Sequence, residues 1–103
     1  MTEVKEIVHD PEVQCDIFGA VRFYESRVPG LGGRFLRTLD DTMVRIARDP
    51  QRFGFYVKPI RSLRVAGFPY RVLFTDEPEF VLILAVAHLS RQPGWWRYRT
   101  ERE

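Results

Sequence analysis

The amino-acid sequence predicts an α+β domain of two layers, in which an N-terminal strand and an antiparallel helical hairpin pack on a small antiparallel sheet. Two observations support this fold class. Apolar residues recur at helical spacing in the first half of the chain, and the second half changes to short apolar runs separated by turn residues. The expected order is β-α-α-β-β-β, in a single domain over residues 1–103.

The first half contains one short strand and two helices. The alternating segment Val4–His9 is the expected strand, and Asp10-Pro11 is a typical helix start, with Asp as N-cap and Pro at the first helical position. A helix over residues 11–27 follows from apolar residues at helical spacing, namely Val13, Ile17, Ala20, Val21 and Tyr24. After the turn VPGLGG, a helix over Leu31–Arg48 has one apolar stripe, made of Phe35, Leu39, Thr42 or Met43, and Ile46.

The second half predicts a loop and three strands. Pro50–Pro59 is the loop, and the strands are Ile60–Ala66, Tyr70–Thr75 and Phe80–His88. Their short connections favour antiparallel neighbours. The last strand is apolar at both alternate sets of positions, so we expect it to be central and covered on both faces. The helices should pack on four sheet residues, Leu63, Val72, Ile83 and Ala85.

Composition excludes several classes of protein. With 45% apolar and 29% charged residues the chain is typical of a globular protein. No apolar run is long enough to span a bilayer, and no signal peptide is visible, which predicts a cytoplasmic protein without a membrane partner. Cys15 is the single cysteine and is predicted to be a small buried residue, and the two histidines cannot form an all-histidine metal site. No metal or cofactor is expected.

The charge is unevenly distributed along the chain. Residues 1–50 hold seven basic and nine acidic residues, whereas residues 51–103 hold nine basic and five acidic ones, a balance of +4. Fourteen of the sixteen basic residues are arginines, which suit bidentate recognition of phosphate or carboxylate. This half therefore fits either a nucleic acid or an acidic protein segment as partner.

Candidate site residues lie on the three C-terminal strands and the tail. Arginines on neighbouring strands, together with His88, would meet on the sheet face that the helices leave open, where they would stabilise charge on a scissile phosphate and move a proton. The candidate catalytic residues are His88, Arg91, Arg61 and Arg71, and the candidate target-binding residues are Arg64, Trp96, Arg97 and Arg99.

Simpler interpretations stand beside these. Arg61 and Arg64 are three residues apart, so they face opposite sides of a regular strand. His88 also fits a hydrogen-bonded strand end. Trp95 and Trp96 fit either a base-stacking platform or a plug that closes the core.

Three stretches resemble the RelE/ParE superfamily of type II toxin–antitoxin toxins, also called plasmid stabilisation proteins. They are PGLGGRFLRTLDDTMVRIARDPQRF, IRSLRVAGFPYRVLF and VLILAVAHLSRQPGWW, in this order over almost the whole chain. The most specific pieces are Arg61 with Phe68-Pro69-Tyr70, and His88 with Arg91 followed by tryptophan.

The resemblance implies a growth-inhibiting toxin that a cognate antitoxin neutralises. RelE-like members cut mRNA on the ribosome with a Lys/Arg cluster and a tyrosine or histidine, whereas ParE-like members poison DNA gyrase. The RelE-type positions here are Arg61, Arg71 and Arg91, with His88 or Tyr98 as proton donor, but Lys58 is the single lysine of the second half. The sequence slightly favours the gyrase-type activity; the alternatives are an mRNA endonuclease and a degenerate, non-toxic binding module.

Overall fold

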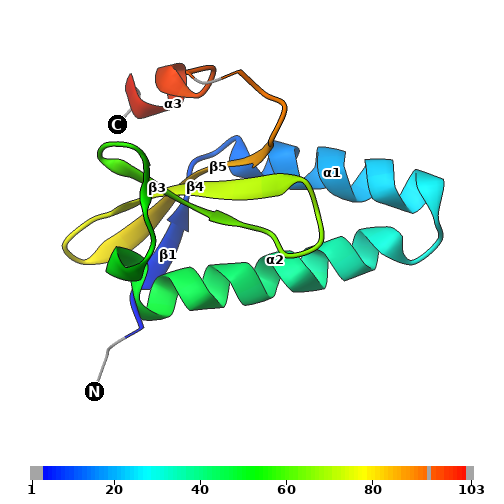
Figure 1. The fold of residues 1–103 in the computed structure, drawn as a ribbon, viewed down its shortest axis with the longest axis horizontal. Coiled ribbons are helices and arrows are strands. Elements are labelled where there is room, and N and C mark those ends of the chain that lie inside the picture. Colours follow the sequence, from blue (N-terminus) through cyan, green and yellow to red (C-terminus); the bar gives the residue numbers. More distant parts are fainter. Residues whose placement is uncertain (1–3, 93, 102–103) are drawn as a thin grey trace.

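Five strands form one sheet in the order β1-β5-β4-β3-β2, as the computed structural model describes it for residues 4–92 and 94–101 (Figure 1). The strands are β1 (Glu6–His9), β2 (Phe55–Val57), β3 (Ile60–Arg64), β4 (Tyr70–Asp76) and β5 (Phe80–His88). The α+β class and the predicted order of elements are confirmed. A three-residue edge strand, β2, lies within the segment that the sequence predicted to be a loop.

The sheet is mixed, which differs from the antiparallel sheet that the sequence predicted. β2, β3, β4 and β5 pair antiparallel, but β1 runs parallel to β5, with Glu6 opposite Phe80 and His9 opposite Ile83. The short connections of the second half carry no information about β1, which is joined to the other strands through two helices. A connection of that length permits parallel pairing.

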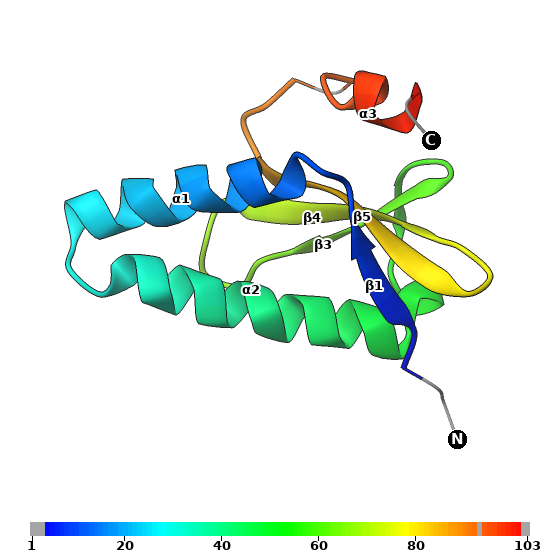
Figure 2. The same cartoon turned by 180° about the vertical axis from the view of Figure 1, so that it is seen from behind.

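Two antiparallel helices, α1 (Val13–Arg27) and α2 (Leu31–Arg48), cover one face of the sheet (Figures 1 and 2). The bounds of α2 are those predicted. α1 begins two residues later than expected, because Asp10 accepts a hydrogen bond from the Glu12 N–H at 3.0 Å and shapes the turn before the helix. The helices approach closely at Gly32, where an added Cβ would lie 2.7 Å from the Val21 carbonyl oxygen.

The main core lies between the helices and the sheet. Its members from α2 are Phe35, Leu39 and Ile46, all at most 1% exposed. Val72 and Phe74 from β4 and Val81, Ile83 and Val86 from β5 meet them. The predicted stripe of α2 is therefore the buried one.

A second, smaller cluster lies on the opposite face of the sheet, beneath a C-terminal helix, α3 (Arg97–Glu101). It contains Ile60, Leu73, Leu84, Ala85 and Trp96. Figures 1 and 2 show α3 and α2 on opposite sides of the sheet. Strand β5 is thus covered on both faces, as expected from its apolar sequence.

An irregularity in the β4–β5 ladder corrects one predicted core contact. Leu73 pairs with Ala85 and Phe74 pairs with Ile83, so Leu84 is an extra residue on β5. The bulge places Leu84 and Ala85 together in the cluster beneath α3. The prediction that Ala85 faces the helices is therefore wrong, because side chains on β5 do not alternate between the two faces of the sheet at the bulge.

Cys15 is exposed, so the prediction of a small buried residue is wrong. The buried residues of α1 are Val13 and Ala20. Cys15 follows Val13 by two positions, about 200° around a helix, and therefore points away from the core.

Candidate functional site

Two predicted residues, Arg64 and Arg71, lie opposite each other on the sheet face away from α1 and α2. They are paired in the β3–β4 ladder. Arg71 is next to Val72 on β4; because Val72 faces the main core, Arg71 faces the other side of the sheet. The Arg71 guanidinium lies 4.9 Å from the centre of the Tyr56 ring. Like charges directly opposite on a sheet destabilise it. The contact of Arg71 with the Tyr56 ring compensates for part of this repulsion.

The C-terminal tail adds two more exposed arginines on this side. The Arg91 guanidinium lies 3.9 Å from the centre of the Trp95 ring, and that of Arg97 lies 6.0 Å from the Trp96 ring. We call Arg64, Arg71, Arg91 and Arg97 the basic face. The rings of Tyr56 and Trp96 lie 6.3 Å apart and connect the strand arginines to those of the tail.

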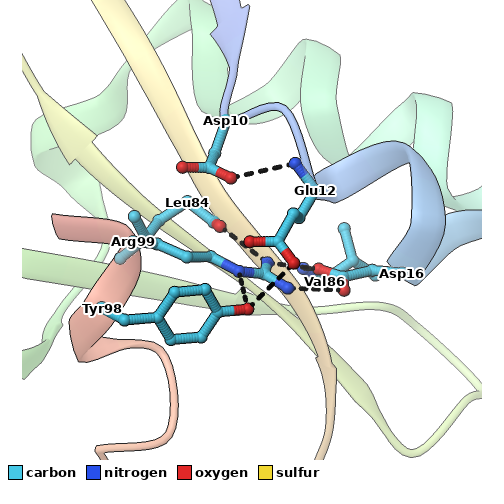
Figure 3. A network of polar contacts seen from close by, with 7 residues as sticks. All are labelled: Asp10, Glu12, Asp16, Leu84, Val86, Tyr98 and Arg99. Carbon is cyan, nitrogen blue, oxygen red and sulfur yellow. Dashed lines mark hydrogen bonds and ion pairs between the residues drawn. The ribbon is translucent and has the colours of Figure 1, made fainter. Parts of the chain in front are cut away.

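Arg99, predicted to bind a target, is instead 3% exposed and paired with Asp16 of α1 (Figure 3). Its Nη1 and Nη2 donate to the two carboxylate oxygens of Asp16 at 2.7 and 3.0 Å, and Nη1 also donates to the Leu84 carbonyl at 3.1 Å. Asp16 in turn accepts a hydrogen bond from the Val86 N–H at 3.0 Å.

The pKa of Arg99 depends on both its burial and its contacts with Asp16. Burial alone lowers the pKa of Arg99, but the hydrogen bonds and charge of Asp16, with a contribution from Tyr98, outweigh it and raise the pKa further. Arg99 is therefore a fixed cation that ties α3 and β5 to α1. This role is structural. Among the described residues of the tail, Arg91 and Arg97 are the arginines that remain exposed.

His88, the predicted proton donor, lies on the opposite side of β4–β5 from Arg71. It pairs with Tyr70, and the two rings are 5.2 Å apart. Tyr70 packs against the main core, so this face is the helix side. The Nδ1 of His88 accepts a hydrogen bond from the Ser90 N–H at 3.0 Å and lies 2.7 Å from the Ser90 hydroxyl. His88 is exposed, and with its Ser90 contacts it agrees with the interpretation as a hydrogen-bonded strand end.

Arg61, the fourth predicted catalytic residue, also lies on the helix side. It is opposite Phe74, donates to the Phe53 carbonyl at 2.7 Å, and has its guanidinium 4.0 Å from the centre of the Phe55 ring. Phe74 and Tyr70 are four positions apart along β4, about 13 Å at ordinary strand rise. Arg61 thus supports the segment before β2 and does not meet His88.

The remaining aromatic candidates, Trp95, Trp96 and Tyr98, all belong to the C-terminal tail. Trp96 is 4% exposed and packs in the smaller cluster, which favours the plug of its two interpretations, and Trp95 is half-buried. The Tyr98 hydroxyl, the alternative proton donor, donates to the Glu12 carboxylate at 3.1 Å and accepts from Nε of Arg99 at 3.2 Å (Figure 3).

Sequence reasoning missed Asp16 and Tyr56. Asp16 carried a detectable signal, because it falls on the apolar stripe of α1 between Val13 and Ala20, and a buried carboxylate requires a cation. Tyr56 carried none, since its segment was predicted to be a loop.

Neither a metal site nor a membrane span is found in the part of the chain that the structure describes. There, no three His, Cys, Asp or Glu side chains gather as a possible metal-binding group. No described helix has the length and apolar character that crossing a membrane requires.

The described residues form a small α+β domain, with a helical hairpin on a five-stranded sheet and arginines on the sheet face away from the hairpin. The model of the family described as "ParE toxin of type II toxin-antitoxin system, parDE" matches residues 7–93, and the chain belongs to this family. It is thus a toxin of a type II toxin–antitoxin module, with a cognate antitoxin as its partner, as the resemblance implied.

The fold is also similar to that of a solved structure. This structure is the "Chromosomal ParDE TA system from P. aeruginosa", with a TM-score of 0.73 and 11% sequence identity, over 82% of this chain and 96% of that one. No curated protein sequence matches the chain.

Proposed function

We propose that this toxin stops growth by inhibiting DNA gyrase and that it does not cut mRNA. One observation supports the choice. The four predicted catalytic residues are divided between the two faces of the sheet, with His88 and Arg61 on the helix side and Arg71 and Arg91 on the other. The alternative proton donor, Tyr98, lies on α3, where its hydroxyl is engaged by Glu12 and Arg99.

This division matters because proton transfer and charge stabilisation must act on the same phosphate. A general acid has to lie within hydrogen-bond reach of the atom it protonates. Arg71 and Arg91 cannot replace His88 in that step, since guanidinium does not release a proton in proteins.

The basic face then serves binding. Arg64, Arg71, Arg91 and Arg97 present four positive charges with aromatic rings between them, which suits an acidic surface or segment. We propose that an acidic segment of the antitoxin and the target compete for this face, so that antitoxin binding neutralises the toxin.

Induction of the protein in cells, with and without the adjacent small reading frame, tests toxicity. We expect growth arrest that coexpression of the antitoxin reverses. Gyrase should be trapped on DNA, and primer extension should find mRNA uncut. Cuts phased to codons would refute the gyrase proposal in favour of an endonuclease. Harmless overexpression would instead support a degenerate binding module.

Two single variants separate the mechanisms within the toxin. Under the proposal, His88→Ala keeps its toxicity, whereas Arg71→Ala on the basic face weakens it. For a nuclease, His88→Ala would lower the cleavage rate by about 10²-fold or more. Each variant is compared at equal abundance of folded protein, so that loss of the fold is not mistaken for loss of function.

A further inference from the structure

A cavity of about 440 Å³ lies on the sheet face away from α1 and α2, between the β2–β3 turn and α3. Its floor is apolar and includes Leu82 and Leu84 of β5, and its walls are the Lys58-Pro59 turn on one side and Trp96 on the other. Figures 1 and 2 both show the β2–β3 connection beside α3. This volume is typical of pockets that hold small organic molecules.

Two residues that line the cavity each have a buried polar atom without a hydrogen-bond partner among the described residues. These atoms are the Thr75 hydroxyl oxygen and Nε1 of Trp96. Such groups are rare in folded proteins because leaving them unpaired is unfavourable. The indole N–H is a donor only, and the threonine hydroxyl both donates and accepts. A molecule that satisfies both must therefore carry a hydrogen-bond acceptor, such as an oxygen.

The charges around the cavity indicate the sign of that molecule. Lys58 and Arg97 line it together with a single acid, Glu77, which leaves one net positive charge. Neither cation forms an ion pair within the described residues: the Lys58 ammonium lies 5.1 Å from the Phe55 ring centre, and Arg97 is exposed. An apolar cavity with buried donors and a basic rim suits an acid with an apolar body.

We propose that this cavity binds a small aromatic acid. Its ring packs against Leu82, Leu84 and the indole of Trp96, an oxygen accepts hydrogen bonds from the two unpartnered groups, and its negative charge faces the basic rim. The site is distinct from the predicted catalytic set and does not depend on which target the toxin inhibits. Because it joins α3 to the β2–β3 turn, an occupant also stabilises the position of the tail.

Titration of the full-length chain with 2-naphthoate, followed by NMR, tests the site. The chain has two tryptophans and therefore two indole N–H resonances, which Trp96→Phe assigns. We expect the Trp96 resonance to move on binding and that of Trp95 to move less. Thr75→Val, which removes the hydroxyl and keeps the shape, should raise the Kd about twofold to tenfold, as loss of one hydrogen bond does. Arg34→Gln, on α2, is the matched control and should leave the Kd unchanged.

The negative charge is tested separately. 2-Naphthamide keeps the ring and the acceptor oxygen but is neutral, and it should bind more weakly. Added salt should weaken binding of the acid and leave that of the amide unchanged. The proposal is overturned if 2-naphthoate at millimolar concentration leaves the Trp96 resonance in place, if Thr75→Val binds as well as the unaltered chain, or if the amide binds equally.

Discussion

Removing one member of the Asp16–Arg99 pair is the sharpest test of how the C-terminal tail is held. Arg99→Met keeps most of the side-chain volume but leaves Asp16 as a buried carboxylate without its cation. The Asp16 side chain is 13% exposed and that of Arg99 is 4% exposed, so solvent screens the pair little. Breaking such a pair typically costs about 3–5 kcal/mol. For a domain of this size we expect Tm to fall by about 12–20 °C.

The assay is urea and thermal unfolding of Arg99→Met, Asp16→Leu and the double variant. The double variant should lose less stability than the two single ones together, because it leaves no unpaired buried charge. Arg97→Met, an exposed neighbour on α3, is the matched control and should change stability by no more than about 0.5 kcal/mol. A loss for Arg99→Met as small as that of the control would refute the inference that the pair holds the tail.

Three other predictions follow from the core and the helices. Leu39→Ala, at a residue 1% exposed, should cost about 2–5 kcal/mol in unfolding experiments, whereas the exposed Leu36→Ala should cost little; equal losses would contradict the assignment of the buried stripe. Gly32→Ala should destabilise the protein through the clash with α1, while Gly19→Ala, which meets nothing within 4 Å, should stabilise it by about 0.5–1 kcal/mol; the reverse order of melting temperatures would contradict the close approach. Burial raises the pKa of Tyr24 above its ordinary value of 10.0, so the unfolded chain loses the phenol proton at a lower pH than the folded one. The contribution of Tyr24 to the free energy of unfolding should therefore be fully present below pH 10 and decrease as the pH rises beyond it. In urea titrations across that range, Tyr24→Phe should make the decrease less steep.

Local patterns were sufficient for the elements of the main core. The apolar period of 3.6 in Leu31–Arg48 predicted both the bounds of α2 and its buried side, because helix geometry depends on neighbours three and four positions away. The three C-terminal strands were also predicted: Phe80–His88 has the observed bounds, whereas Ile60–Ala66 ends at Arg64 and Tyr70–Thr75 extends to Asp76. The stretches with FPY and the terminal tryptophans also led to the correct toxin family.

The tertiary structure decided where the charged residues point and what they contact. The sequence allowed Arg61, Arg71, His88 and Arg91 to share a face, and strand register divided them. Register depends on pairing between strands and, at Leu84, on a bulge that one extra residue creates. No local pattern encodes either.

Arg99 shows the physical reason most clearly. In the sequence it is one more basic residue of a charged tail, with nothing nearby to distinguish it from Arg97. Its partner Asp16 is 83 residues away, and the two meet only because the sheet brings α1 and α3 to the same end of β5 (Figure 3). The sequence by itself determined that the tail is basic; packing over that distance decided which arginine is buried in the fold and which remain on the surface.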